Sequence, residues 1–381
     1  MTARQFYLTI FIFSVSLKVQ KMPCLSAGFL GRNNYLLVLF FMVVDLVGIA
    51  LAFLILNKTK NMNPEKHNSK PYQIIKTIIL IFATLYFMLQ GTLLYEAIHD
   101  LFAHVLFDNL PWTIFSVLLI AAIFYLANSG IKTIGHSMEL YFFVIFVSYI
   151  ILAIFGGRQT DFSVVLPFET INFKSLCDTF TPFNIWFGDF FMILFLGRES
   201  KNIKWKWTTF VYTLSMIFVA VLFVEFAGIY GEYASIQSSL ISEISEQSML
   251  GVDIGRVDWF FIILTEVGTI ISSSLCLYFA KQSASGVVSK IKSSYVLAFL
   301  MVILYLVDVC YLVDTNVKEF VFMRFSGVFS LVTKVSLFLI ILFWCLFQKK
   351  DKYPSKHIKK TGQVKVWKLF SSDMLGLSFF L

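Results

Sequence analysis

Long apolar blocks separated by short polar segments run along almost the whole chain. Most of these blocks have the length of about 17 to 25 residues that an α-helix needs to cross about 30 Å of hydrocarbon. A transmembrane β-barrel would instead show short segments of alternating polarity. The pattern predicts an all-α integral membrane protein with ten transmembrane helices, at residues 6–30, 35–56, 73–98, 112–127, 138–156, 182–197, 207–231, 259–280, 294–313 and 321–347.

The composition agrees with this pattern. Hydrophobic residues make up 58% of the chain and charged residues 14%, and the mean hydropathy is +0.79. No folded globule could hide that much apolar area from water, so the composition excludes a water-soluble protein. Five scattered cysteines suggest neither a disulfide framework nor a metal site.

Basic residues between the blocks predict the orientation, because cytoplasmic loops carry the excess of Lys and Arg. With the N-terminus inside, 21 of the 31 Lys and Arg residues fall on the cytoplasmic side and six on the other. We therefore expect a cell-membrane protein with both termini in the cytoplasm. Residues 1–348 would form the membrane domain, and residues 349–381 a basic cytoplasmic tail attracted to anionic lipid.

Two of the ten predicted helices, the first and the sixth, have polar residues in their middles. The first contains SLKVQKMP, with two lysines, an amide and Pro23; the sixth reads PFNIWFGDFFMILFLG, with Gly188 and Asp189 inside it. Ten helices divide into five plus five, and an odd repeat length makes the halves inverted copies, in which helices 1 and 6 correspond. The sequence thus predicts a 5+5 inverted repeat with broken helices 1 and 6.

Paired breaks predict a binding pocket near the bilayer midplane. A break frees carbonyl groups that suit a cation and a half-helix N-terminus that suits an anion, so the pocket fits a zwitterion such as an α-amino acid. Alternatively, Lys18 and Asp189 pair with each other for structural reasons, and Pro23 is a simple kink. The predicted substrate-binding residues are Ser16, Leu17, Lys18, Val19, Gln20, Trp186, Phe187, Gly188 and Asp189.

Three stretches resemble the spore-germination permease family, which contains the B subunits of germinant receptors. The opening ARQFYLTIFIFSVSLKVQKMPCLSAGFLGRNNYLLVL has a basic-amide break, Met-Pro where the family tends to have Leu-Pro, and Gly31-Arg32 before the second helix. IGRVDWFFIILTEVGTI is similar to the family's basic-x-acidic element, through Gly255, Arg256, Asp258 and Trp259. FGDFFMILFLGRES is similar to its sixth helix, with Asp189 after a Gly.

The likeness in hydropathy extends over roughly residues 2–348. It implies the leucine-transporter-like 5+5 fold of the amino acid, polyamine and organocation transporter superfamily, and recognition of amino acids or related solutes. The chain departs from the wider superfamily in lacking a Gly-x-Gly break in helix 1. It also lacks glycines in the loop SVVLPFETINFKSLCDTFTP.

The resemblance also implies a place for ion coupling, because a sodium site in this fold can form between the helix 1 break and hydroxyls of helix 8. We expect the ammonium of Lys18 to take the place of sodium, with protons or no ion as the coupling species. Alternatively, the hydroxyls bond neighbouring helices. The predicted coupling residues are Lys18, Glu266, Thr269, Ser272 and Ser273.

Other ionisable residues also fall inside the predicted spans. Glu225 or Glu266 would carry a proton, and position along the span favours Glu266. Asp45, Asp308 and Lys334 are expected near span ends. The segment EYASIQSSLISEISEQSMLGVD after the seventh span has apolar residues at roughly helical spacing, so we expect it to lie against the outer surface, as a gate.

The sequence contains no nucleophile elbow, phosphate loop, paired-His zinc motif or dinucleotide fingerprint, so we expect no enzyme activity, no cofactor and no metal. The first hypothesis is a secondary transporter of amino acids or similar small zwitterionic solutes that works by alternating access. The second is a germinant-sensing receptor subunit that binds such a ligand without net transport and acts on partner subunits. A third is an assembly subunit with a vestigial pocket. Membrane lipid is an expected partner and nucleic acid is not.

Overall fold

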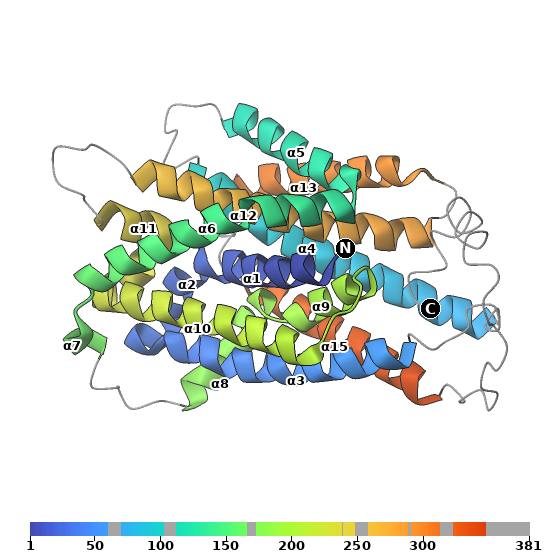
Figure 1. Cartoon of the computed structure of the whole chain (residues 1–381), viewed down its shortest axis with the longest axis horizontal. Helices are drawn as coiled ribbons and strands as arrows, with labels where there is room; N and C mark the ends of the chain where they lie inside the picture. The colour runs from blue at the N-terminus through green and yellow to red at the C-terminus, as the bar shows by residue number, and fades with distance from the viewer. Residues whose placement is uncertain are drawn as a thin grey trace.

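The computed structural model describes residues 1–59, 70–102, 112–165, 173–237, 239–247, 258–288, 291–312 and 323–347. Within these residues all regular structure is helical, and the long helices run side by side in one bundle (Figure 1). The unbroken long helices are α3 (Tyr35–Thr59), α4 (Lys70–Leu101), α5 (Trp112–Ser129), α6 (Ile131–Gln159), α10 (Trp205–Tyr230), α12 (Asp258–Val287), α13 (Ser293–Leu312) and α15 (Met323–Phe347).

Several of these helices have the length and apolarity of membrane spans. Six helical stretches of the described chain pass that test, or seven when a bent pair of helices at the N-terminus is counted as one span. Shorter apolar helices cover 115–129, 293–306 and 326–339. Each of the ten predicted blocks coincides with helical residues, whereas the count of ten spans and the inverted repeat stay predictions.

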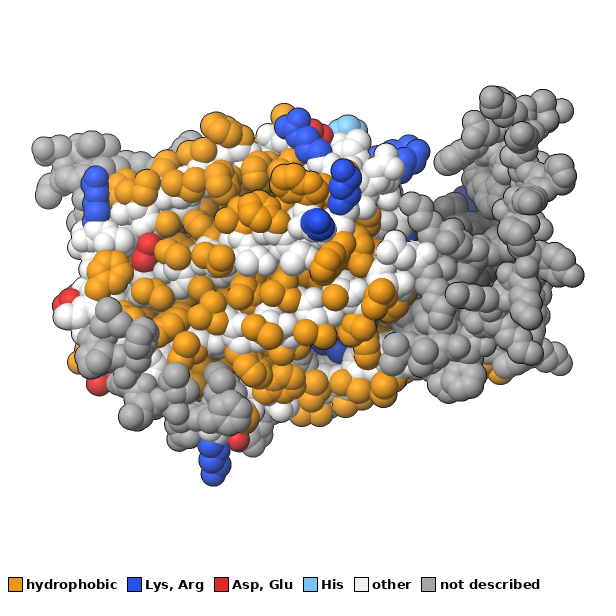
Figure 2. Space-filling model, turned by 60° about the horizontal axis from the view of Figure 1, so that its bottom comes forward, with side chains coloured by type: hydrophobic (Ala, Val, Ile, Leu, Met, Phe, Trp, Pro, Cys, Tyr) orange, Lys and Arg blue, Asp and Glu red, His pale blue; other side chains and the backbone are white. Residues whose placement is uncertain are grey.

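The outer face of the bundle is apolar where a membrane protein meets lipid. Hydrophobic side chains cover the broad middle of the face in Figure 2. Large apolar residues are widely exposed on the described helices, among them Leu54 at 65%, Leu118 at 63% and Phe143 at 74%. Exposure of such an apolar surface to water would be unfavourable, whereas contact with the hydrocarbon of a bilayer would not.

The first predicted helix is broken, as its sequence predicts. It consists of α1 (Ala3–Val19) and α2 (Met22–Leu30), whose axes are bent by 53°. Pro23 lies in the first turn of α2. It lacks the N–H that a continuous helix would donate to the carbonyl of Val19, and its ring would clash with that carbonyl. We call Gln20 and Lys21, which separate the two helices, the α1–α2 break.

The sixth predicted helix is also broken. It consists of α8 (Phe173–Phe183), a 3₁₀ turn η4 (Asn184–Trp186) and α9 (Asp189–Arg198). Phe187 is extended, and Gly188 has φ +100° and ψ 28°, a left-handed conformation that only glycine adopts at low cost. We call residues 184–188 the α8–α9 break.

The helices pack in two groups that meet around α1. In one group α1, α3, α9 and α10 pack on one another; in the other, α12 packs on α4, α5, α6 and α13, and α15 packs on α4. Helix α1 runs through the middle of the bundle (Figure 1) and also contacts α12 and α6. Gly268 of α12 permits this close approach, since a Cβ there would lie 3.1 Å from Ile12 and 3.3 Å from the Ser16 hydroxyl.

Candidate functional site

An ion pair joins the two broken helices. Nζ of Lys18, in the last turn of α1, lies 2.7 Å from Oδ2 of Asp189, the first residue of α9, and the side chains are 0% and 2% exposed. Lys18 also donates to the carbonyl of Ser14 at 3.3 Å, one turn earlier. A buried charge requires such pairing, because desolvation costs several kcal/mol per ion. The pairing that the sequence left open between these two residues is therefore present.

A second buried carboxylate holds the backbone of the α8–α9 break. Both oxygens of Asp45, on α3, accept from the amide of Gly188, at 3.0 and 3.1 Å. Tyr212 of α10 donates its hydroxyl to Oδ2 of Asp45 at 2.7 Å. Asp45 is 1% exposed. The amide of Gly188, the N-cap residue of α9, thus already has an anion as its acceptor, as the helix dipole favours.

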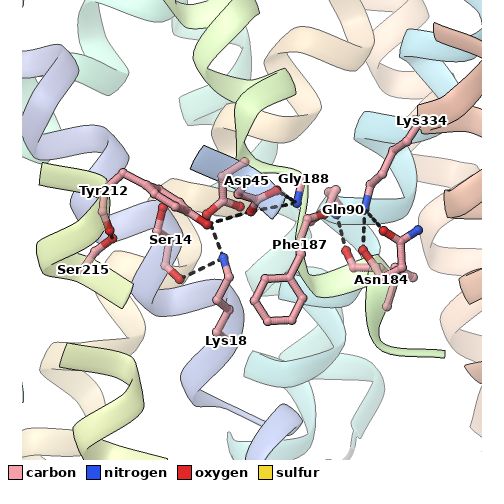
Figure 3. A network of polar contacts seen from close by, with 12 residues as sticks. Ser14, Lys18, Asp45, Gln90, Asn184, Phe187, Gly188, Tyr212, Ser215 and Lys334 are labelled. Atoms are coloured by element: carbon pink, nitrogen blue, oxygen red, sulfur yellow. Dashed lines mark hydrogen bonds and ion pairs between the residues drawn. The ribbon is translucent and has the colours of Figure 1, made fainter. Parts of the chain in front are cut away.

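Three further side chains hold the carbonyls that the α8–α9 break exposes, and two of them, Lys334 and Gln90, are seen in Figure 3. The ammonium of Lys334, on α15, donates to the carbonyls of Asn184 and Phe187 and, at 3.4 Å, to Oδ1 of Asn184. On α4, Gln90 donates to the carbonyl of Ile185. Tyr86, also on α4, donates to the carbonyl of Gly188 at 3.0 Å. The break therefore has an ammonium on its carbonyls and a carboxylate on its amide, all supplied by the protein itself.

An aromatic ring fills the centre of the same break. Phe187 stacks on Phe41 of α3 with ring centroids 4.1 Å apart and an interplanar angle of 6°. The ammonium of Lys18 lies 5.3 Å from the centroid of the Phe187 ring. A cation near an aromatic ring gains electrostatic energy from the ring quadrupole. Phe187 thus adds to the burial and the stabilisation of the Lys18 charge.

The α1–α2 break has different surroundings. The side-chain amide of Gln20 donates to Oε1 of Glu266 on α12 and, at 3.5 Å, to the hydroxyl of Thr269. The main-chain carbonyl of Gln20 accepts from the amide of Leu240 at 3.2 Å. Leu240 is the first residue of α11 (Leu240–Gln247). This break is therefore bounded by α12 on one side and by α11 on another.

Glu266 is a buried carboxylate that pairs with no cation in the part of the chain that the structure describes. It is 0% exposed, and its Oε2 atom and the Oε1 atom of Gln20 have no hydrogen-bond partner in the described part of the chain. No ion pair involving Glu266 occurs among the described residues. Because an uncompensated charge in this environment is costly, the position calls for a proton or a cationic group.

Helix α11 covers the α1–α2 break. It follows a 3₁₀ turn, η5 (Gly231–Ile236), and it packs on α6 and α12. Leu240, Ile241 and Ile244 are each at most 1% exposed. The apolar spacing that predicted a surface-lying helix here thus marks the buried face of α11, whose first amide bonds the break.

The other predicted binding residues all lie at the two breaks. Ser16, Leu17 and Val19 are at most 4% exposed at the end of α1, and Trp186 is 5% exposed in η4.

The predicted coupling residues, by contrast, do not share one set of contacts. Thr269 lies by Gln20, whereas the hydroxyl of Ser273 donates to the carbonyl of Gly91 on α4 at 3.1 Å. Ser272 is buried in α12. Lys18 forms its recorded bonds with Asp189 and Ser14.

The prediction that Asp45 and Lys334 lie near the ends of their spans is wrong. Both lie near the middle of their helices, are at most 5% exposed, and bind the α8–α9 break. In the sequence, each is an ionisable residue in the middle of a long, mostly apolar segment. Burial of such a charge is costly unless it has a buried partner, and this cost could have indicated their role. Gln90 and Tyr86 carried no such signal, because amides and phenols are common within spans.

Some predicted features fall elsewhere. Gly255, Arg256 and residues 349–381 lie outside the described residues, as does the side chain of Asp308. Glu225, the second candidate proton carrier, is 6% exposed in α10, and its Oε2 faces Gly156 of α6. In the described part of the chain no three His, Cys, Asp or Glu residues are grouped to hold a metal ion.

Comparison with known families adds an independent finding. The family model for spore germination proteins, described as a spore permease, matches residues 1–317. No curated protein sequence matches the chain.

Proposed function

The chain belongs to the spore germination protein family, and we propose that it is a multi-pass membrane permease that binds an amino acid or a similar small zwitterionic solute at the α1–α2 break. In this proposal it carries the solute across the cell membrane by alternating access. Family membership and the apolar helices support a membrane permease or a germinant-receptor component. The solute class and the mechanism are the proposal.

One observation carries the proposal: the buried carboxylate of Glu266 is hydrogen-bonded to Gln20, and each of these two side chains has an oxygen without a partner in the described part of the chain. A primary ammonium has three N–H donors and one positive charge. It would therefore compensate the charge of Glu266 and bond both free oxygens. The α8–α9 break is a weaker candidate for the solute, because its exposed amide and carbonyls already bind Asp45 and Lys334.

The carboxylate of the solute would lie at the start of α2. The first amides of a helix have no partner within it, and the helix dipole favours an anion there. Lys21 precedes α2 and adds a positive charge, although it also lies 3.4 Å from Glu96. A zwitterion would thus span the gap between the first turn of α2 and Glu266.

The polar contacts support a mechanism in which four helices move together. Lys18, Asp189, Asp45 and Tyr212 tie α1, α9, α3 and α10 into one unit. The described polar contacts of the two breaks with the other helices run from Gln20 toward α12 and α11, from Lys21 toward α4, and from the α8–α9 break toward α4 and α15. Rocking this unit against the rest would open the breaks first. The 5+5 inverted repeat and cytoplasmic termini complete the proposal.

Uptake in proteoliposomes tests the proposal. Radiolabelled amino acids would be offered to the intact protein, to Glu266→Gln and to Glu225→Gln, a matched control that also removes one buried carboxylate. We expect specific uptake of at least one amino acid, a loss of about tenfold or more for Glu266→Gln because a charged hydrogen bond is lost, and little change for Glu225→Gln. Equal uptake by all three proteins would contradict the site.

A second function is favoured by the description of the family as spore germination proteins. In it the same pocket senses a germinant amino acid or similar ligand, and partner subunits respond. Such a receptor requires a ligand that prefers one conformation. Saturable binding to the detergent-solubilised protein that Glu266→Gln abolishes, together with no flux in proteoliposomes, would select this function over transport.

A further inference from the structure

The ammonium of Lys334 occupies a cup of three oxygen atoms. Two are main-chain carbonyls, of Asn184 and Phe187, and the third is Oδ1 of Asn184. Figure 3 shows the side chain reaching from α15 into the α8–α9 break, where these oxygens converge on Nζ. The ammonium has three donors and all three oxygens accept, so its hydrogen-bonding capacity is used completely.

Such a cup is a cation site by its chemistry. Converging carbonyl oxygens replace the hydration shell of monovalent cations in proteins. No ion pair involving Lys334 occurs among the described residues, so the ammonium is held by neutral oxygens, as a bound cation would be. The centroid of the Tyr86 ring lies 5.7 Å from Nζ of Lys334, and an aromatic ring so placed also favours a positive charge.

The backbone at Gly188 makes room for this ammonium. A Cβ at Gly188 would lie 2.7 Å from Cε and 3.0 Å from Nζ of Lys334. The left-handed conformation of Gly188, with φ +100°, also turns the chain so that the carbonyl of Phe187 can join the cup. The glycine at position 188 thus leaves the space that the side chain of Lys334 occupies.

We propose that the α8–α9 break contains a monovalent-cation site whose resident cation is the tethered ammonium of Lys334. This cation compensates the partial charges of the freed carbonyls. Since it is covalently attached, the break keeps its shape without dissolved sodium or potassium. Removal of the side chain would leave a vacant cup that a free primary ammonium or an alkali cation can enter. The proposal concerns the stability of the break and is independent of which solute the protein binds.

Chemical rescue of Lys334→Ala tests this site. Thermal unfolding of the purified protein in detergent would be followed with choline chloride, methylammonium chloride, sodium chloride or potassium chloride at about 100 mM. Lys281→Ala is the matched control, because Lys281 is also a buried lysine. Its ammonium donates to the carbonyl of Ala127 at 2.9 Å and lies 5.3 Å from the ring centroid of Tyr278. Among the described residues its ammonium donates to this single carbonyl, so no cup of three oxygens surrounds it there.

We expect Lys334→Ala to unfold at a lower temperature than the parent in choline, and methylammonium to raise its midpoint by about 2 °C or more through binding to the folded state. For the parent, the unfolding midpoint should not differ between the four salts. The midpoint of Lys281→Ala should likewise be independent of the salt. If Lys334→Ala cannot be purified in choline, recovery of folded protein when methylammonium is present during solubilisation supports the site.

Three results would overturn the proposal. The first is an absence of rescue of Lys334→Ala by any of the small cations, in midpoint or in folded yield. The second is equal rescue of Lys281→Ala. The third is a parent protein that needs sodium or potassium for its own stability. Lys334→Gln adds a check, because a neutral side chain that restores the full parental midpoint would show that charge is not required.

Discussion

The ion pair between Lys18 and Asp189 allows the most direct test of the described geometry. Its Nζ–Oδ2 distance is 2.7 Å and its side chains are 0% and 2% exposed, so water screens neither charge. Removing one member of such a pair leaves the other charge buried, at a cost of about 3–5 kcal/mol. We expect Lys18→Met to lower the free energy of unfolding by that amount. Asp189 would be left as an uncompensated carboxylate whose Oδ1 has no partner in the described chain.

We expect Asp189→Asn to lower the free energy of unfolding by less than Lys18→Met does. We expect the double variant to lose less than the sum of the two single losses. In Asp189→Asn the amide oxygen of the new side chain can still accept a hydrogen bond from Lys18. Lys18 also retains its hydrogen bond to the carbonyl of Ser14, at 3.3 Å, and its contact with the Phe187 ring. In the double variant no charge remains to be compensated. Its loss should therefore fall short of the summed single losses by about 1–3 kcal/mol, the usual coupling between contacting residues.

Unfolding by sodium dodecyl sulfate in mixed micelles, followed by the fluorescence of the seven tryptophans, would measure these free energies. Arg4→Met is the control, because Arg4 pairs with Glu139 at 3.2 Å but its side chain is 75% exposed. An exposed pair of this kind contributes about 0–1 kcal/mol. Additive losses in the double variant, or a Lys18→Met loss no larger than that of Arg4→Met, would refute the reasoning.

Three further predictions test the two breaks. Gly188→Ala should destabilise the protein more than Gly130→Ala in the same assay: both positions have positive φ, of +100° and +93°, but only at Gly188 would a Cβ meet other atoms within 4 Å. Equal losses would mean that Lys334 does not occupy the space beside Gly188. Tyr212→Phe should cost about 1.5–3 kcal/mol in the same titration, because its hydroxyl donates to a buried carboxylate at 2.7 Å; a loss below about 0.5 kcal/mol would contradict that bond. Leu240→Pro, at the first residue of α11 where proline is tolerated, should remove the amide bond to the α1–α2 break and raise the alkylation rate of buried Cys24 above that in Leu240→Ala, measured by peptide mass spectrometry. An unchanged rate would mean that this bond does not hold α11 closed.

The positions of both breaks could be predicted from the sequence because their causes are local. Pro23 removes a helix hydrogen bond wherever it stands within a span, and a Gly followed by Asp189 interrupts an otherwise apolar run. Charges beside these breaks are costly in hydrocarbon, which predicted that Lys18 and Asp189 are buried and paired or bound. The pairing itself was one of the alternatives that the residues left open.

The surroundings of the breaks could not be predicted in the same way. Whether Asp45 points into the bundle depends on how α3 is rotated about its axis. Apart from Asp45, the middle of α3 is apolar on every side, and such a pattern does not specify a buried face. In α15, by contrast, Ser326, Ser330 and Thr333 recur at helical spacing with Lys334 and are buried with it, but the sequence does not show which helix they face. The roles of Gln90 and Tyr86 depend in turn on where the carbonyls of another helix come to lie. These contacts are set by tertiary packing.

The bond between the amide of Leu240 and the carbonyl of Gln20 has a consequence for hydration. If α11 moved away, that carbonyl would be left without its donor inside the bundle, and a buried carbonyl without a donor is costly. A water molecule or a donor group of an arriving molecule would have to replace the amide of Leu240. Movement of α11 would therefore be coupled to the hydration of Gln20.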